Sequence, residues 1–121
     1  FDVCADWKWC FKQIEELNID KLLTSGQKKS AYEGRDLIAK LVQLKTRVGI
    51  IAGAGVNNTN LEAILRETQC KEFHSSCRVS RESKMKFRRL DIPMGASNDN
   101  QNEFLIKYTD KNKVAELVNI Y

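Results

Sequence analysis

The sequence has a single histidine among its 121 residues and no two cysteines in a C-x-x-C arrangement. Structural zinc sites take four Cys or His ligands at short spacings, so a zinc ribbon or finger is excluded as the basis of the fold. The four cysteines fit free thiols better than two disulfides, because a domain of this size with an ordinary apolar content does not need cross-links. We therefore expect a reduced, cytoplasmic protein.

Long apolar runs are also missing. The longest, residues 48–56, contains three glycines and is far shorter than the roughly 20 residues that a membrane-spanning helix needs. The chain opens on Phe1, without an initiator Met or a basic, then apolar, leader. We expect no membrane partner and no secretory signal, and we expect that the natural start has been lost.

Charge separates the function classes only weakly. The 121 residues fit one globular domain, residues 1–121. A formal net charge of +4 slightly favours small anionic ligands but falls short of what a dedicated nucleic-acid binder carries. The segment from Arg78 to Arg89 holds six basic residues and one acidic residue. We interpret it as a solvated loop and expect no nucleic-acid partner.

Short apolar runs that end in small or polar residues alternate with amphipathic helical patterns, which is typical of βα units. Strands are predicted at residues 1–4, 21–26, 48–52 and 72–76. Helical spacing of apolar residues follows at residues 7–17, 37–44, 61–65 and 109–121. Thr59 and Glu62 fit a capping box for the third helix. The pattern predicts an α/β fold, and it leaves open a small parallel sheet or half of a barrel of roughly 250 residues.

Five short strings stand out along the chain. They are Phe1-Asp2, Leu23-Thr24-Ser25-Gly26, Gly53-Ala54-Gly55-Val56, Glu72-Phe73-His74-x-Ser76, and Ser83-x-Met85-Lys86-Phe87-Arg88 with Met94-Gly95 beyond it. In this order and at this spacing the strings resemble the CutC family of copper homeostasis proteins, and the Met-Lys-Phe-Arg segment discriminates best. The chain departs from the family pattern at Ala54, where a third glycine is usual, and at Cys4 and Cys77.

The resemblance implies a TIM-type (β/α)8 barrel of which this chain covers about the last four βα units. Residues 78–103 would then form a long loop over the barrel mouth. In such barrels the ligand site lies at the carboxyl ends of the strands. The candidate ligand-binding residues there are Asp2, Thr24, Ser25, Gly26, Gly53, Gly55, Asn57, Ser76 and Arg78.

Strand alternation turns Glu72, His74 and Ser76 to one face, opposite Phe73. A carboxylate beside an imidazole can do acid–base chemistry, so Glu72 and His74 are the candidate catalytic residues. An equally weighted alternative is a polar pair that fills the barrel. The loop of residues 53–57 either offers backbone N–H groups to an anion or only makes a tight turn.

Copper is the ligand that the resemblance implies, with no organic cofactor. Cu(I) prefers soft thiolate and thioether donors. Cys4 and Cys77 lie near predicted strand ends, so they are the candidate metal ligands. Cys10 lies on the apolar face of its helix and Cys70 ends another, so both are predicted to be structural.

Three function classes follow. The resemblance implies copper homeostasis through binding or trafficking of Cu(I). An alternative is an enzyme that acts on a small, phosphate-like anion at the barrel mouth with Glu72 and His74. The third is a non-catalytic half-barrel that acts as a homo-oligomer, because half of a barrel has unpaired strand edges that favour self-association.

Overall fold

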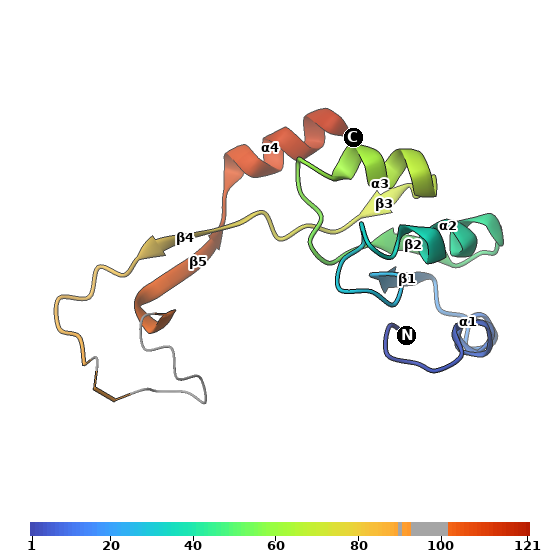
Figure 1. Ribbon diagram of the computed structural model, residues 1–121, viewed down its shortest axis with the longest axis horizontal. Coiled ribbons are helices and arrows are strands. Elements are labelled where there is room, and N and C mark those ends of the chain that lie inside the picture. The colour runs from blue at the N-terminus through green and yellow to red at the C-terminus, as the bar shows by residue number, and fades with distance from the viewer. Residues whose placement is uncertain (90, 93–101) are drawn as a thin grey trace. The chain divides into compact units, whose positions relative to one another are not determined.

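The computed structural model describes residues 1–89, 91–92 and 102–121 (Figure 1). These residues form two compact units, one of Phe1–Ser75 with Ala115–Tyr121 and one of Ser76–Val114. Among the described residues no helix is both long and apolar enough to cross a membrane. The Met94-Gly95 string lies outside the described residues.

The first unit contains a parallel sheet in the order β1-β2-β3. Its strands are β1 (Lys21–Thr24), β2 (Gly49–Ala52) and β3 (Glu72–Phe73). The helices that alternate with them are α1 (Trp7–Glu16), α2 (Arg35–Gln43) and α3 (Leu61–Thr68), which follow one another along one side of the sheet (Figure 1). The predicted α/β class with a parallel sheet is confirmed.

The two faces of this sheet differ in burial. The side chains of Leu22, Thr24, Ile50 and Ala52 are buried, and they alternate with more exposed neighbours along β1 and β2. The fully buried side chains of the helices complete this core; they include Ile38, Leu41, Leu61 and Ile64. On the opposite face Leu23 is 52% exposed. The helices therefore cover one face of the sheet and leave the other face open.

The predicted strand at residues 1–4 is wrong, because this segment forms a turn in which the Cys4 backbone N–H donates to the Phe1 carbonyl at 3.0 Å. The predicted capping box is wrong as well. The Thr59 hydroxyl donates to the Asn57 side chain at 2.6 Å, and α3 begins after Asn60. Before α3, local hydrogen bonds of the Asn57 side chain thus replace the expected capping box.

The second unit is built on an antiparallel hairpin of β4 (Arg78–Glu82) and β5 (Leu105–Thr109). The expected loop at residues 78–103 is therefore corrected at its start, where Arg78 pairs with Thr109 and Glu82 with Leu105. A 3-10 turn, Asn102–Phe104, precedes β5. Arg81 and Arg88 lie over the rings of Tyr108 and Phe104, so these cations pack on aromatic side chains of their own unit.

The predicted C-terminal helix is confirmed as α4 (Lys111–Ile120). Its first turn is capped by Asp110, whose Oδ1 accepts from two backbone N–H groups at 3.0 Å. The last residues of α4 belong to the first unit. There the Tyr121 hydroxyl donates to the Lys71 carbonyl at 2.6 Å, and its ring lies 5.5 Å from that of Phe73. Phe73 thus faces the helix layer, as predicted.

The turn after β2 contains a residue in an unfavourable backbone conformation. Ala54 has φ 75°, and the following Gly55 has φ 71°. In this region the Cβ of an L-residue crowds the next carbonyl oxygen, whereas glycine has no Cβ. We expect Ala54→Gly to raise the free energy of unfolding by roughly 0.5–1 kcal/mol, measured by urea denaturation.

Ala63 in the middle of α3 is the matched control. Its helical backbone gains nothing from glycine, so Ala63→Gly should lower the free energy of unfolding by about 1 kcal/mol. Equal destabilisation by both changes would contradict the strain assigned to Ala54.

Candidate functional site

Asp2 is the centre of a hydrogen-bond network at the carboxyl end of β1. Its Oδ1 accepts from the Thr24 hydroxyl at 2.5 Å and from the Gln27 backbone N–H at 3.0 Å. Its Oδ2 accepts from the Ser25 backbone N–H at 2.9 Å. Thr24 Oγ1 in turn accepts from the Gly26 N–H at 2.9 Å. The predicted candidates Asp2, Thr24, Ser25 and Gly26 are therefore brought together.

This network fixes the charge state of Asp2. Partial burial opposes ionisation, but the hydrogen bonds from Thr24, Ser25 and Gln27 outweigh it and lower the pKa of Asp2. A carboxylate held by several donors stays ionised at neutral pH. The carboxylate is already satisfied by the loop, so its first role is to hold that loop in place.

The loop after β1 can form only because two glycines approach closely. A Cβ on Gly26 would collide with the carbonyl oxygen of Gly34, and a Cβ on Gly34 would collide with that of Ser25. Gly26 also has φ 70°. The Gly26 of the predicted site is thus required by backbone packing.

The loop of residues 53–57 also bonds mainly to itself and to its neighbour loop. The Gly53 N–H donates to the Thr24 carbonyl at 2.9 Å, and the Ala54 carbonyl accepts from the Ala31 N–H at 3.0 Å. The Asn57 amide donates to the Gly55 carbonyl at 3.0 Å. These bonds support the tight-turn interpretation of Gly53, Gly55 and Asn57, and the anion site there stays a prediction.

The two candidate catalytic residues lie in different surroundings. The Glu72 carboxylate accepts from the Lys21 ammonium at 2.6 Å, and a Cβ on Gly49 would lie 3.6 Å from Glu72 Oε1. Lys21, Gly49 and Glu72 each begin a strand. The carboxylate thus lies toward the amino ends of the strands, with the missing side chain of Gly49 leaving room for the ion pair.

His74 is exposed and follows β3, extending its pairing through an N–H bond to the Ala52 carbonyl at 2.8 Å. A Cβ on Gly53 would lie 3.7 Å from His74 Cβ and 2.5 Å from Leu23 Cδ1. His74 therefore lies on the open face of the sheet, at its carboxyl edge, as the alternation predicted. A Glu72–His74 catalytic pair remains a prediction.

Ser76, Cys77 and Arg78 belong to the second unit, where they support its hairpin. The Ser76 carbonyl accepts from the Thr109 hydroxyl at 3.1 Å, and the Cys77 carbonyl accepts from the Asp110 N–H at 2.9 Å. Arg78 pairs with Thr109 in β4. Cys77 is buried and Arg78 is exposed.

The cysteines of the first unit have unequal surroundings. Cys70 is buried, and its thiol contacts the carbonyls of Ile50 at 2.9 Å and Glu72 at 3.1 Å, in agreement with a structural role. Cys4 and Cys10 are both half-buried. A side-chain hydrogen bond with Cys4, together with desolvation, raises the pKa of Cys10. Sequence reasoning separated these two residues.

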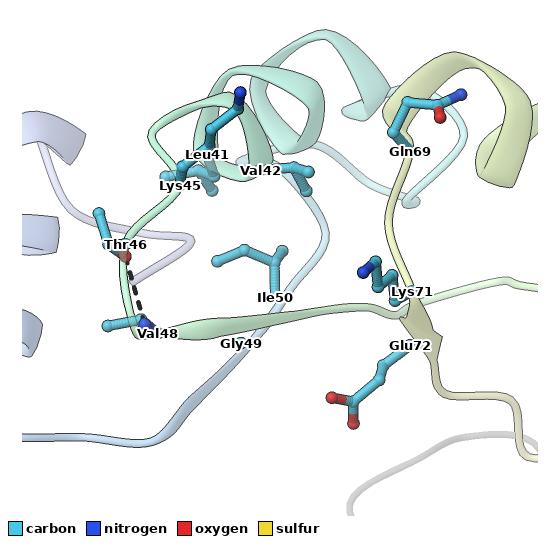
Figure 2. Close-up of a pocket in the computed structure, with 10 residues that line it drawn as sticks. All are labelled: Leu41, Val42, Lys45, Thr46, Val48, Gly49, Ile50, Gln69, Lys71 and Glu72. Carbon is cyan, nitrogen blue, oxygen red and sulfur yellow. Dashed lines mark hydrogen bonds between the residues drawn. The ribbon is translucent and has the colours of Figure 1, made fainter.

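A pocket of about 440 Å³ lies at the other end of the sheet, between the last turns of α2 and α3 and the starts of β2 and β3 (Figure 2). Figure 2 shows apolar side chains of Leu41, Val42 and Ile50 on one side and the polar groups of Lys71 and Glu72 on the other. Sequence reasoning did not find it. The pocket lies at the opposite end of the strands from Asp2, Thr24 and Ser25, so it is separate from the predicted site.

Comparisons with known proteins give one consistent family. A protein of Parabacteroides distasonis named as a family protein CutC is 44% identical over 115 residues, which cover 94% of this chain and 47% of the relative. The copper homeostasis protein cutC homologs of mouse and human are 40% and 39% identical over 118 residues, covering 97% of this chain and 43% of each relative.

The chain spans about half the length of these curated relatives. The model of the CutC family matches residues 1–79, which is more than half of the chain and includes all three strands of the parallel sheet. On this match, this chain belongs to the CutC family.

Proposed function

We propose that this chain takes part in copper homeostasis and that it binds copper as Cu(I) in the cytoplasm. The carrying observation is the similarity, over nearly its whole length, to mouse and human proteins that are named for copper homeostasis. Cu(I) prefers thiolate ligands. The half-buried thiol of Cys4, beside the Asp2 network, supplies a reachable donor of that kind.

An anaerobic competition titration tests this function on the purified, reduced chain. We expect one Cu(I) per chain to be withheld from a coloured Cu(I) chelator, because thiolates compete well for a soft ion. Alkylating the accessible thiols with N-ethylmaleimide before the titration should abolish that binding. A folded chain that yields all its copper to the chelator would refute direct copper binding.

We further propose that the three βα units of the first unit are part of a TIM-type barrel. The supporting features are the parallel β1-β2-β3 order and the helices along one side. Strands that are covered by helices on one face need other strands of the barrel to cover the opposite face. That opposite face carries Leu23, His74 and the Lys21–Glu72 ion pair.

The open face also supports self-association of this chain. Leu23 is an exposed leucine on that face, and β1 and β3 are the edges of the three-stranded parallel sheet. We expect the chain to have twice its 13.9 kDa mass in solution, and Leu23→Lys to give a monomer, because a charge on the face opposes its burial. Light scattering after size-exclusion chromatography measures the mass.

Leu17 provides the control, because it is 72% exposed at the end of α1 and not part of the open face. Leu17→Lys should leave the dimer intact. A monomeric chain before any substitution, or a dimer that persists in Leu23→Lys, would rule out association through this face.

The second candidate function is an enzyme that acts on a small anion with Glu72 and His74. In the structure the Glu72 carboxylate is bound by Lys21 at 2.6 Å, so acid–base chemistry by Glu72 requires this ion pair to open. His74 is exposed at the carboxyl edge of the sheet. Barrel enzymes place their catalytic groups at this edge.

A further inference from the structure

The pocket at the amino ends of β2 and β3 has an aliphatic interior. The most deeply buried of its lining residues are Leu41, Val48 and Ile50, and the half-buried Val42 lies beside them. Among the described residues that line it, none is aromatic. Its volume of about 440 Å³ lies within the usual range of small-molecule pockets, roughly 300–1,000 Å³. The pocket therefore suits a small ligand with an aliphatic body.

Lys71 supplies this pocket with a cation. It directly precedes β3, so alternation places its side chain on the face of Phe73, toward the helix layer, and opposite Glu72. In Figure 2 the Lys71 nitrogen lies on the same side of the β2 ribbon as Ile50, whereas the Glu72 carboxylate lies on the other side. The Lys71 carbonyl accepts from the Tyr121 hydroxyl at 2.6 Å, which fixes the backbone from which the ammonium group extends.

The positive charge of the pocket is not neutralised within the part of the chain that the structure describes. Glu72 is the one acidic residue among the described lining residues, and its carboxylate is bound by Lys21 at 2.6 Å. Lys45 and Lys71 are exposed lining residues, and neither forms an ion pair with any described residue. The excess of positive charge attracts an anion.

The ends of α2 and α3, which border the pocket, oppose an anion only weakly. The Val42 carbonyl accepts from the Lys45 N–H at 3.2 Å, and the Leu65 carbonyl accepts from the Gln69 N–H at 2.9 Å. The Gln69 side-chain amide donates to the Arg66 carbonyl at 2.7 Å. The negative end of a helix resides in its unsatisfied carbonyl groups. Since these carbonyls are satisfied, the two lysines determine the charge that a ligand meets.

We propose that this pocket binds an aliphatic monocarboxylate, with its hydrocarbon chain against Ile50 and its carboxylate at the Lys71 ammonium. Burial of the hydrocarbon chain against apolar side chains favours binding. Arginine is the preferred residue for phosphate groups, and no described lining residue is an arginine, a cysteine or a histidine. The site therefore goes beyond the copper function proposed above and does not depend on it.

A methyl-detected NMR titration of the purified chain with octanoate tests the site. We expect the methyl signals of Leu41, Val42, Val48 and Ile50 to shift, while those of Leu23 on the open face of the sheet stay in place. The uncharged analogue 1-octanol should shift the same signals but bind about fivefold more weakly. An ion pair at a partly exposed site contributes up to about this factor.

Lys71→Met removes the charge and keeps an apolar side chain, so it should weaken octanoate binding about fivefold and leave the binding of 1-octanol unchanged. Lys29→Met is the matched control, because Lys29 is an exposed lysine outside the pocket, and it should keep the octanoate affinity. Circular dichroism checks that both variants are folded. Unchanged octanoate affinity in Lys71→Met, shifts at Leu23 in place of Ile50, or no shifts at all would each overturn the proposal.

Discussion

The hydrogen bonds accepted by Asp2 determine where the first residues of the chain lie. Residues 1–4 form no strand and so gain no support from a sheet. They are held by the Asp2 carboxylate, which accepts from Thr24, Ser25 and Gln27, and by the Gln27 side-chain amide, which donates to the Cys4 carbonyl. Hydrogen bonds to a charged group contribute roughly 1.5–3 kcal/mol each, which outweighs the cost of partly burying this side chain.

The pH range of this contribution follows from its sign. The folded pKa of Asp2 is lowered, so its stabilisation is complete above the unfolded value of about 3.9 and is lost as the pH falls through the lower folded value. At neutral pH the loop after β1 is therefore fixed. Gln27, which is part of that loop, can then hold Cys4. The position of Cys4 therefore depends, through Gln27, on the hydrogen bonds that Asp2 accepts.

The sequence predicted those elements whose signal is local. Helices α1, α2 and α3 follow from apolar spacing, and β1 and β2 from short apolar runs before glycine or polar turns. The hairpin of β4 and β5 was missed, because its two strands are far apart in sequence and have exposed, polar side chains. Asn57, Asn58, Thr59 and Asn60 are all residue types that cap helices. The hydrogen bonds that Asn57 accepts from Thr59 depend on loop geometry that no spacing rule contains.

The candidate site was predicted in part for the same reason. Thr24, Ser25 and Gly26 follow one another at the end of β1, as predicted, but Asp2 joins them from a turn through its hydrogen bonds and not from the end of a strand. Alternation predicted the face of the sheet on which Glu72 lies, but not its position along the strand. That position depends on the register, which pairs Glu72 with Ile51 and places its carboxylate beside Lys21.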